Sequence, residues 1–229
     1  METLGVGIIG CGWVAGEYVK AFCADERSEI RGLVSRDRAN AERYRDMYGL
    51  SCAIEADAAK MLRMGDIDIV VVSTPHDVHT EYAVAAAEAG KHVIVEKPAA
   101  ITVEDMRRQV EAVRKNKVKS LVGFVLHWNP LLMTIDRLID EGAFGNIFMV
   151  EVDYMHRIWM TPEEKWLGSK KQSGTAILTG GCHAVDAMRW FARSEAEEVC
   201  AYQAKTENPI ENPGTISVNV KFEDGKVGR

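Results

Sequence analysis

Apolar and polar positions follow two different patterns along the 229-residue chain. In the first half, short apolar runs alternate with stretches whose apolar residues recur at helical spacing. The run at 67–73 is the clearest, because its β-branched residues are apolar on both faces, as in a buried parallel strand. Residues 1–123 are therefore predicted to form an α/β domain, a doubly wound parallel sheet with helices on both faces.

Start and stop signals place the elements of this domain. Gly49 and Gly90 stand where helices should end, and Thr102 with Asp105 has the spacing of an N-terminal capping box. Strands are predicted at 4–9, 29–35, 67–73, 92–95 and 119–125. Helices are predicted from the glycine turn after residue 9 to about 24, at 38–48, at 78–89 and from 102 onward.

The pattern changes after residue 123. A helix is predicted at 131–142, and strict alternation at 148–154 and 216–222 is typical of half-exposed antiparallel strands. Another helix is predicted at about 182–191. We therefore expect an α+β domain with a mainly antiparallel open sheet over 124–229.

The last residues carry a hairpin signal. Asp224-Gly225 follows the second alternating run, and a returning strand should follow Val227, yet the sequence stops at Arg229. A lone edge strand exposes unpaired backbone groups, so we expect the sheet to be incomplete and the chain to be C-terminally truncated. A frayed tail after a complete domain is the alternative.

Composition and charge argue against several classes of protein. The net charge of -6 argues against a general nucleic-acid binder, and the apolar runs are too short to cross a bilayer. The N-terminus lacks the basic and long apolar regions of a secretory signal. Five cysteines without a CxxC pair indicate reduced thiols and neither disulfides nor a zinc site. We expect a cytoplasmic protein with no metal, no nucleic-acid partner and no membrane partner.

A glycine motif follows the first predicted strand. It reads Gly10-Cys11-Gly12-Trp13-Val14-Ala15, a GxGxxA pattern at the start of a helix. In such a turn the first glycine permits a tight bend, the second lets a pyrophosphate approach the backbone, and the small third residue lets helix and strand pack closely. The helix N-terminus adds N–H groups and a positive dipole end. The pattern predicts dinucleotide binding, with a plain glycine turn as the alternative.

The choice of dinucleotide depends on the end of the second strand. An acidic residue there would bind the ribose 2′-hydroxyl of NAD, but Ser35 and Arg36 occupy this place. A hydroxyl followed by a guanidinium suits a 2′-phosphate, which favours NADP over NAD. Arg36 could instead stack on the adenine of either cofactor or be solvated, and the neighbouring Asp37 leaves the choice open.

Two further segments lie where predicted strands end. They are therefore expected at the carboxyl edge of the sheet, where ligands bind in this architecture. The first reads Ser73-Thr74-Pro75-His76-Asp77-Val78-His79. Since no Cys or carboxylate cluster accompanies its histidines, we interpret them as turn residues with a capping role and not as metal ligands. The second is Glu96-Lys97-Pro98, an unusual place for a surface lysine. Further on, Gly180 and Gly181 precede His183, which taken alone could be a core histidine.

These motifs resemble those of one family. The segments 7–12, 73–79, 90–98 and 181–186 occur in the same order in the glucose–fructose oxidoreductase / inositol dehydrogenase (Gfo/Idh/MocA) family, and the resemblance covers essentially the whole chain. It implies an NAD(P)-dependent oxidoreductase that transfers hydride between nicotinamide and a sugar, polyol or related hydroxyl or carbonyl substrate. It also implies a homo-oligomer formed through the open sheet, and a cis bond between Lys97 and Pro98.

The resemblance assigns roles to individual residues. Lys97 matches the catalytic lysine and His183 the general base or acid, while Thr179 stands where the family often has an aspartate and supplies no charge. Substrate contacts are expected from Lys97, His127, Asn129, His183 and Asp186. Cofactor contacts are expected from Gly10, Cys11, Gly12, Trp13, Val14, Ala15, Ser35, Arg36, Ser73, Thr74, Pro75, His76, His79, Glu96 and Lys97.

Two other functions fit the same motifs. An NAD-retaining enzyme of the same family would cleave a glycosidic bond through transient oxidation and would form no net NADH. A non-catalytic dinucleotide-binding regulator gains support from Thr179 and loses it from Lys97 and His183. The substrate itself is not indicated, because its pocket is built from the less distinctive second half of the chain.

Overall fold

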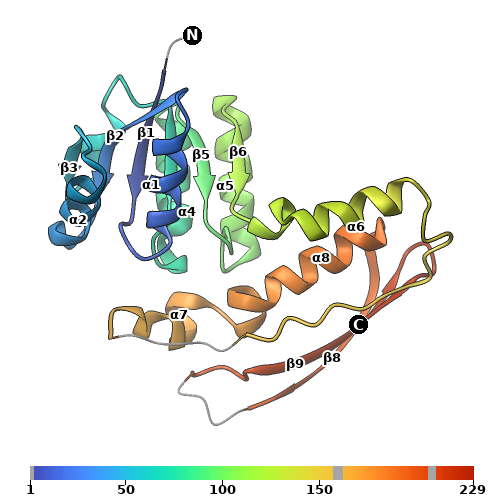
Figure 1. Ribbon diagram of the computed structural model, residues 1–229. Coiled ribbons are helices and arrows are strands. Elements are labelled where there is room, and N and C mark those ends of the chain that lie inside the picture. The colour runs from blue at the N-terminus through green and yellow to red at the C-terminus, as the bar shows by residue number, and fades with distance from the viewer. Residues whose placement is uncertain (1–2, 157–161, 206–209) are drawn as a thin grey trace. The chain divides into compact units, whose positions relative to one another are not determined.

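The computed structural model describes residues 3–156, 162–205 and 210–229. Backbone contacts divide the chain into two compact units, Met1–Gly123 and Phe124–Arg229, shown in Figure 1 and described separately below. Within the described ranges, every helix is too short or too polar to cross a membrane.

The first unit is built on a six-stranded parallel sheet with the order β3-β2-β1-β4-β5-β6. Its strands are β1 (Leu4–Ile9), β2 (Ser28–Val34), β3 (Ala53–Glu55), β4 (Ile69–Val72), β5 (His92–Val95) and β6 (Ser120–Val122). The chain runs outward from β1 to β3 and then returns to β4 on the other side of β1. This reversal makes a switch point between β1 and β4, the place where doubly wound sheets bind ligands. The predicted doubly wound sheet is confirmed.

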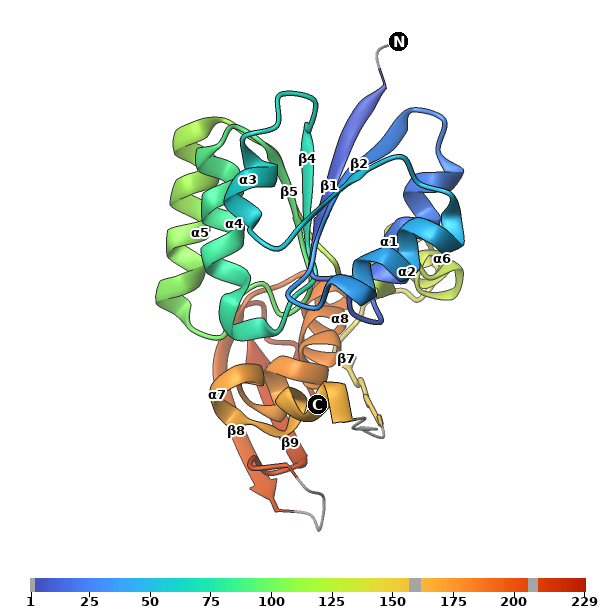
Figure 2. The same ribbon diagram turned by 90° about the vertical axis from the view of Figure 1, so that its left-hand side faces the viewer.

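Helices cover both faces of this sheet (Figure 2). One face carries α1 (Ala15–Ala24) and α2 (Arg38–Tyr48), and the other carries α3 (Ala58–Leu62), α4 (His79–Glu88) and α5 (Val103–Asn116). A hydrophobic cluster lies beneath each group of helices. Because both faces are covered, Val70, Val71 and Val72 of the central strand β4 are fully buried, which explains its run of β-branched residues.

The helix ends follow signals in the sequence. Asp37 and Asp57 cap α2 and α3 by accepting hydrogen bonds from backbone amides two residues on. Thr102 accepts a 3.0 Å hydrogen bond from the Asp105 amide and thus caps α5, while the Asp105 carboxylate accepts from the Thr102 hydroxyl at 2.7 Å, so the N-cap half of the predicted capping box is confirmed. Gly49 follows α2 in the left-handed region at φ 61, where a β-carbon would be strained.

Short elements of the first unit were not predicted. β3 has three residues and α3 has five, too few for a hydrophobic period to be recognised. The prediction of one strand at 119–125 is wrong in length, because β6 ends at Val122 and a 3-10 helix, η2 (Val125–Trp128), begins soon after. A second 3-10 helix, η1 (His76–Val78), precedes α4.

The second unit combines a four-stranded sheet with several helices. The strands, in the order β7-β10-β9-β8, are β7 (Met149–Val150), β10 (Val227–Gly228), β9 (Thr215–Phe222) and β8 (Ala196–Ala204). β8 and β9 form a long antiparallel pair (Figure 1). β10 pairs with β9 in antiparallel orientation and with β7 in parallel orientation. The helical segments are α6 (Pro130–Asp140), η3 (Pro162–Gly168), α7 (Lys170–Ser173), the π-helical η4 (Ile177–Gly181) and α8 (Cys182–Ala192). The mainly antiparallel sheet is confirmed.

Three details of this unit differ from the sequence predictions. The strand predicted at 148–154 shrinks to the two residues of β7. β8 was not predicted, because Glu197 and Glu198 interrupt its apolar alternation and the whole strand is exposed. The Asp-Gly hairpin is confirmed by the 2.9 Å hydrogen bond from the Phe222 amide to the Lys226 carbonyl. The expectation that β9 lacks a partner is wrong, since β8 and β10 pair with its two sides.

Candidate functional site

The glycine turn between β1 and α1 is held by the ends of two neighbouring strands. The amide of Gly10 donates to the carbonyl of Val34 at the end of β2, at 2.9 Å. The Ser73 hydroxyl, just after β4, donates to the Gly10 carbonyl at 2.8 Å. Gly10 has φ 95, and a β-carbon there would lie 2.6 Å from the Ser73 carbonyl oxygen. Only glycine therefore fits at position 10.

A tyrosine from α2 supports the second half of this turn. The Tyr44 hydroxyl donates a 2.8 Å hydrogen bond to the carbonyl of Gly12. Its ring lies against Gly16 of α1, where an added β-carbon would be 3.0 Å from the hydroxyl oxygen. Tyr44 was not predicted as a site residue. The sequence does contain a signal for this role. Tyr44 follows Ala41 by three residues, which places both on the buried face of α2, and a buried tyrosine hydroxyl usually needs a hydrogen-bond partner.

The outer side of the turn is open. A β-carbon added to Gly12 would meet no described atom within 4 Å, so a ligand could approach the backbone there. Val14, the N-cap residue of α1, makes no side-chain capping hydrogen bond, and the amides of Gly16 and Glu17 donate to the carbonyls of Trp13 and Val14 at 3.1 Å. Open space beside the backbone of Gly12, at the N-terminal end of a helix and at the switch point, fits a dinucleotide pyrophosphate.

Two residues of the glycine motif differ in burial, since the side chain of Cys11 lies in the core and that of Trp13 lies at the surface. Cys11 is buried, its Sγ lies 3.6 Å from the Val34 carbonyl, and burial raises the pKa of its thiol to about 12. It is therefore a protonated, unreactive core residue whose backbone alone belongs to the open turn. Trp13 is 77% exposed. Its indole stands at the surface beside the same turn.

The end of β2 presents a hydroxyl and a guanidinium. Ser35 is buried, and its amide donates to the Glu55 carbonyl of β3 at 3.1 Å. Arg36 is exposed and forms no ion pair with any residue in the described ranges. The carboxylate of Asp37 is used as the N-cap of α2, where it accepts from the Ala39 amide at 3.1 Å. Asp37 thus has a structural role at the point where an NAD-specific acidic residue was considered.

His79 joins the turns that follow β4 and β5. It is fully buried, with Nδ1 2.9 Å from the Pro98 carbonyl and Nε2 2.7 Å from the Thr74 carbonyl. Burial lowers the pKa of His79, while the two carbonyls and the nearby carboxylates oppose this effect. The predicted capping role is wrong, because the ring faces carbonyl oxygens and no helix amide. His76 is also buried, with its ring centroid 5.4 Å from that of His79.

The lysine motif follows β5 directly. Lys97 and Pro98 are joined by a cis peptide bond, as expected from the resemblance. Glu96 is only 7% exposed, and its carboxylate accepts hydrogen bonds from the Tyr18 hydroxyl at 2.7 Å and from the Lys97 amide at 3.1 Å. Buried carboxylates are rare without such partners. Tyr18 was not predicted as a site residue.

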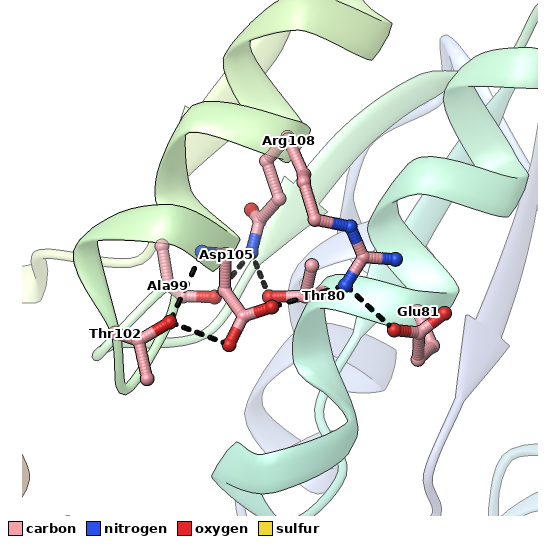
Figure 3. Close-up of polar contacts among 7 residues, drawn as sticks. Thr80, Glu81, Ala99, Thr102, Asp105 and Arg108 are labelled. Carbon is pink, nitrogen blue, oxygen red and sulfur yellow. Dashed lines mark hydrogen bonds and ion pairs between the residues drawn. The ribbon is translucent and has the colours of Figure 1, made fainter.

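The segment that leaves this turn is fixed to α4 and α5 (Figure 3). The side-chain amide of Gln109 donates to the Ala99 carbonyl at 2.6 Å and to the Thr80 hydroxyl at 2.9 Å, and all three groups are buried. On the exposed side, Arg108 forms ion pairs with Glu81 and Asp105. A buried polar network of this kind limits the movement of the backbone after Pro98.

In the second unit, His183 is buried on α8. It is 4% exposed, and the centroids of Tyr154 and Phe124 lie 5.3 Å and 5.9 Å from its ring. Thr179 lies one turn earlier, in η4, and its hydroxyl donates at 3.1 Å to the carbonyls of Ser173 and Thr175. The Thr179 side chain is thus bonded to local backbone.

Three other residues of this unit, His127, Asn129 and Asp186, were also predicted to contact the substrate. His127 Nε2 lies 2.7 Å from Asp186 Oδ2, and its ring stacks on Trp190 with centroids 4.1 Å apart. These residues line a polar cavity of about 530 Å³. Asn129 instead caps α6, its side-chain oxygen accepting from the Leu131 amide at 3.0 Å. Within the described ranges, no three His, Cys, Asp or Glu side chains are arranged to hold a metal ion.

Comparison with known families identifies both units. A family described as "Oxidoreductase family, NAD-binding Rossmann fold" matches residues 4–124, and the "GFO/IDH/MocA C-terminal domain" matches residues 132–229. The chain belongs to the Gfo/Idh/MocA family. The resemblance inferred from the glycine, lysine and histidine motifs is confirmed.

Individual relatives are distant in sequence but match 83% or more of this chain. A 1-carboxy-3-chloro-3,4-dihydroxycyclohexa-1,5-diene dehydrogenase of Comamonas testosteroni is 24% identical over 96% of this chain and 55% of its own length. A levoglucosan dehydrogenase of Pseudarthrobacter phenanthrenivorans is 29% identical over 83% of this chain and 52% of its own. The crystal structure of GenD2 from gentamicin A biosynthesis, in complex with NAD, superposes with a TM-score of 0.92 at 25% identity and covers 100% of this chain and 65% of that one. The chain spans about half the length of the curated relatives.

Proposed function

We propose that this chain is part of an NAD(P)-dependent oxidoreductase that acts on a hydroxyl or carbonyl group of a sugar, polyol or related compound. The open side of the β1–α1 turn carries the proposal. At Gly12 there is open space beside the backbone that leads into α1, while Gly10 is held closely against Ser73. That arrangement, in a family described as NAD-binding, supports the first unit as the dinucleotide domain.

The names of the relatives support the substrate class. The levoglucosan dehydrogenase is named for a sugar derivative, and the Comamonas enzyme is named for a cyclic compound with two hydroxyl groups. We assign substrate binding and subunit pairing to the second unit, whose strand β8 is exposed along its whole length. Cys11 is a buried, protonated thiol and the sequence has no CxxC pair, which supports a reducing compartment such as the cytoplasm.

We assign the chemistry to two side chains. The bound nicotinamide supplies the hydride donor or acceptor. The Lys97 ammonium stabilises negative charge that develops on the substrate oxygen, and the His183 imidazole takes up or returns the hydroxyl proton. Thr179 provides no charge to either group. These assignments rest on the family motifs that Lys97 and His183 match.

The residues that follow β2, from Ser35 to Asp37, support a preference for NADP. Asp37 is engaged as a helix cap, whereas Arg36 is exposed next to the buried Ser35. A free guanidinium binds the two negative charges of a 2′-phosphate better than it binds a ribose hydroxyl. We therefore propose NADP as the preferred cofactor, with NAD as the weaker ligand.

A pair of glycine variants tests dinucleotide binding. Gly12→Ala adds a methyl group to the open side of the turn, and Gly65→Ala adds one in equally open space on the loop before β4. Both should fold as the unmodified chain does, since neither β-carbon meets a neighbour. In fluorescence titrations with NADH and NADPH, Gly12→Ala should weaken binding about tenfold or more and Gly65→Ala should not. Equal affinities for all three proteins, or no binding to the unmodified chain, would refute the proposal.

One observation favours a second function, a dinucleotide-binding regulator without turnover. Thr179 replaces the usual aspartate and its hydroxyl is bonded to the carbonyls of Ser173 and Thr175. A regulator would bind NADH or NADPH and consume neither across a broad panel of sugars and polyols. Oxidation or reduction of the cofactor with any member of the panel would exclude this function.

A further inference from the structure

The Glu96 carboxylate has two different partners, one for each oxygen. Oε1 accepts from the Tyr18 hydroxyl at 2.7 Å, and Oε2 accepts from the backbone amide of Lys97 at 3.1 Å. Tyr18 lies on α1, the helix that begins at the glycine turn. A single buried carboxylate therefore connects this helix with the backbone of the lysine motif.

The surroundings of this pair are shaped to fit it. Gly123 follows β6, and a β-carbon there would lie 2.7 Å from the Tyr18 hydroxyl and 2.8 Å from Glu96 Oε1. Gly123 has no positive φ that would require a glycine. The small residue at 123 is thus explained by the space that the Tyr18 and Glu96 side chains need. Burial and the Glu96 carboxylate raise the pKa of Tyr18, so its hydroxyl remains protonated and continues to donate.

The backbone on the other side of Lys97 is held as well. His79 contacts the Pro98 carbonyl, and Gln109 donates to the Ala99 carbonyl. The Lys97 residue itself is held by the hydrogen bond from its amide to Glu96 Oε2. The orientation of the Glu96 carboxylate depends in turn on Tyr18, its hydrogen-bond donor on the opposite oxygen.

We propose that Tyr18 is a positioning residue for Lys97, acting through Glu96. The Tyr18 hydroxyl fixes the carboxylate, and the carboxylate fixes the amide from which the lysine side chain projects. Small displacements of a reacting group cost much of its catalytic effect. The proposal rests on the proposed function only in giving Lys97 a role in turnover, since the coupling from Tyr18 to Lys97 is a structural claim.

Tyr18→Phe removes the hydroxyl and keeps the ring. Tyr82→Phe is the matched control, because Tyr82 is half-buried on α4 and its hydroxyl forms no hydrogen bond within the described part of the chain. With levoglucosan and other sugars and polyols as substrates, kcat should fall about tenfold or more in Tyr18→Phe, while the Kd for NADPH and NADH stays unchanged. Tyr82→Phe should change neither quantity. A normal kcat in Tyr18→Phe, or a parallel loss of dinucleotide affinity, would overturn the proposal.

Two further measurements separate this proposal from a general loss of stability. Glu96→Gln and the double variant complete a cycle, and the effects on kcat should not add, because both changes break the same connection. Additive effects would show independent roles. Lysines labelled by reductive ¹³C-methylation give an NMR signal for Lys97, assigned with Lys97→Arg. This signal should move in Tyr18→Phe and stay in place in Tyr82→Phe, and an unmoved signal would overturn the coupling even if the chain turns over no substrate.

Discussion

Gly10 and Ser73 fit together without room for a side chain between them. The Ser73 hydroxyl donates to the Gly10 carbonyl at 2.8 Å, and a β-carbon on Gly10 would come within 2.6 Å of the Ser73 carbonyl oxygen. The atom in the way is backbone, so it cannot turn aside as a flexible side chain would. The first glycine of the motif is therefore fixed by the strand on the far side of the switch point, whereas Gly12 faces open space.

This difference predicts that alanine at position 10 lowers the stability of the fold, whereas alanine at position 12 does not. Gly10→Ala combines a positive φ of 95 with a backbone clash and should lower the free energy of unfolding by about 2 to 4 kcal/mol. Gly12→Ala should leave it nearly unchanged and affect dinucleotide binding only. Urea unfolding followed by tryptophan fluorescence measures both. Similar stability for the two variants would show that the contact with Ser73 does not constrain the turn.

The elements that could be predicted from the sequence are those with a strong periodic pattern or a clear end signal. The β-branched run that becomes β4, the capping box at Thr102 and the αL glycine after α2 each specify a local structure. Short or charged elements could not be predicted in this way. β3 is stabilised by pairing with β2, and β8 is a fully exposed strand whose partner β9 lies beyond residues 206–209.

The site could be predicted only where a residue type reveals its chemistry. The glycine turn and the lysine motif have recognisable sequences, but Tyr44 and Tyr18 are ordinary residues of helical stripes until their hydroxyls are seen to bond with Gly12 and Glu96. His79 shows the opposite case. Its position suggested a helix cap, yet the fold brings the Pro98 carbonyl, 19 residues away, to its ring.

His79 gives a prediction for the pH dependence of stability. Burial lowers its pKa from the ordinary value of 6.5, so between that value and the lower folded pKa the unfolded chain binds more protons. The contribution of His79 to stability is therefore complete above pH 6.5 and is lost as the pH falls through this window. Urea unfolding of the wild type from pH 8 to pH 5 should show this decrease.

His79→Gln isolates the effect, because glutamine does not titrate in this range. The variant is expected to be less stable at pH 8, where it loses a buried hydrogen bond, and the difference from the wild type should shrink toward pH 5. The quantity to compare is the slope of the unfolding free energy against pH. If both proteins have the same slope below pH 6.5, His79 does not titrate differently on folding.

Lys97→Ala tests the assigned role of the lysine. Turnover should fall by about a hundredfold or more, since the ammonium that stabilises the developing charge is gone. The affinity for NADH and NADPH should stay within about a factor of three, because the glycine turn supplies the principal contacts. Lys20→Ala, an exposed position on α1, is the control for the loss of one charge. Unchanged turnover would remove Lys97 from the mechanism.

Arg36→Ala tests the preference for NADP. A guanidinium bound to a 2′-phosphate contributes a charge-assisted hydrogen bond, so its loss should weaken NADPH binding about tenfold to a hundredfold and leave NADH nearly unaffected. Arg63→Ala, exposed at the end of α3, removes the same charge from another part of the unit and should change neither affinity. The decisive quantity is the ratio of the two dissociation constants, measured by fluorescence titration at one ionic strength. If Arg36→Ala weakens both dinucleotides equally, the guanidinium stacks on the adenine or acts through general charge, and the end of β2 does not select the phosphate.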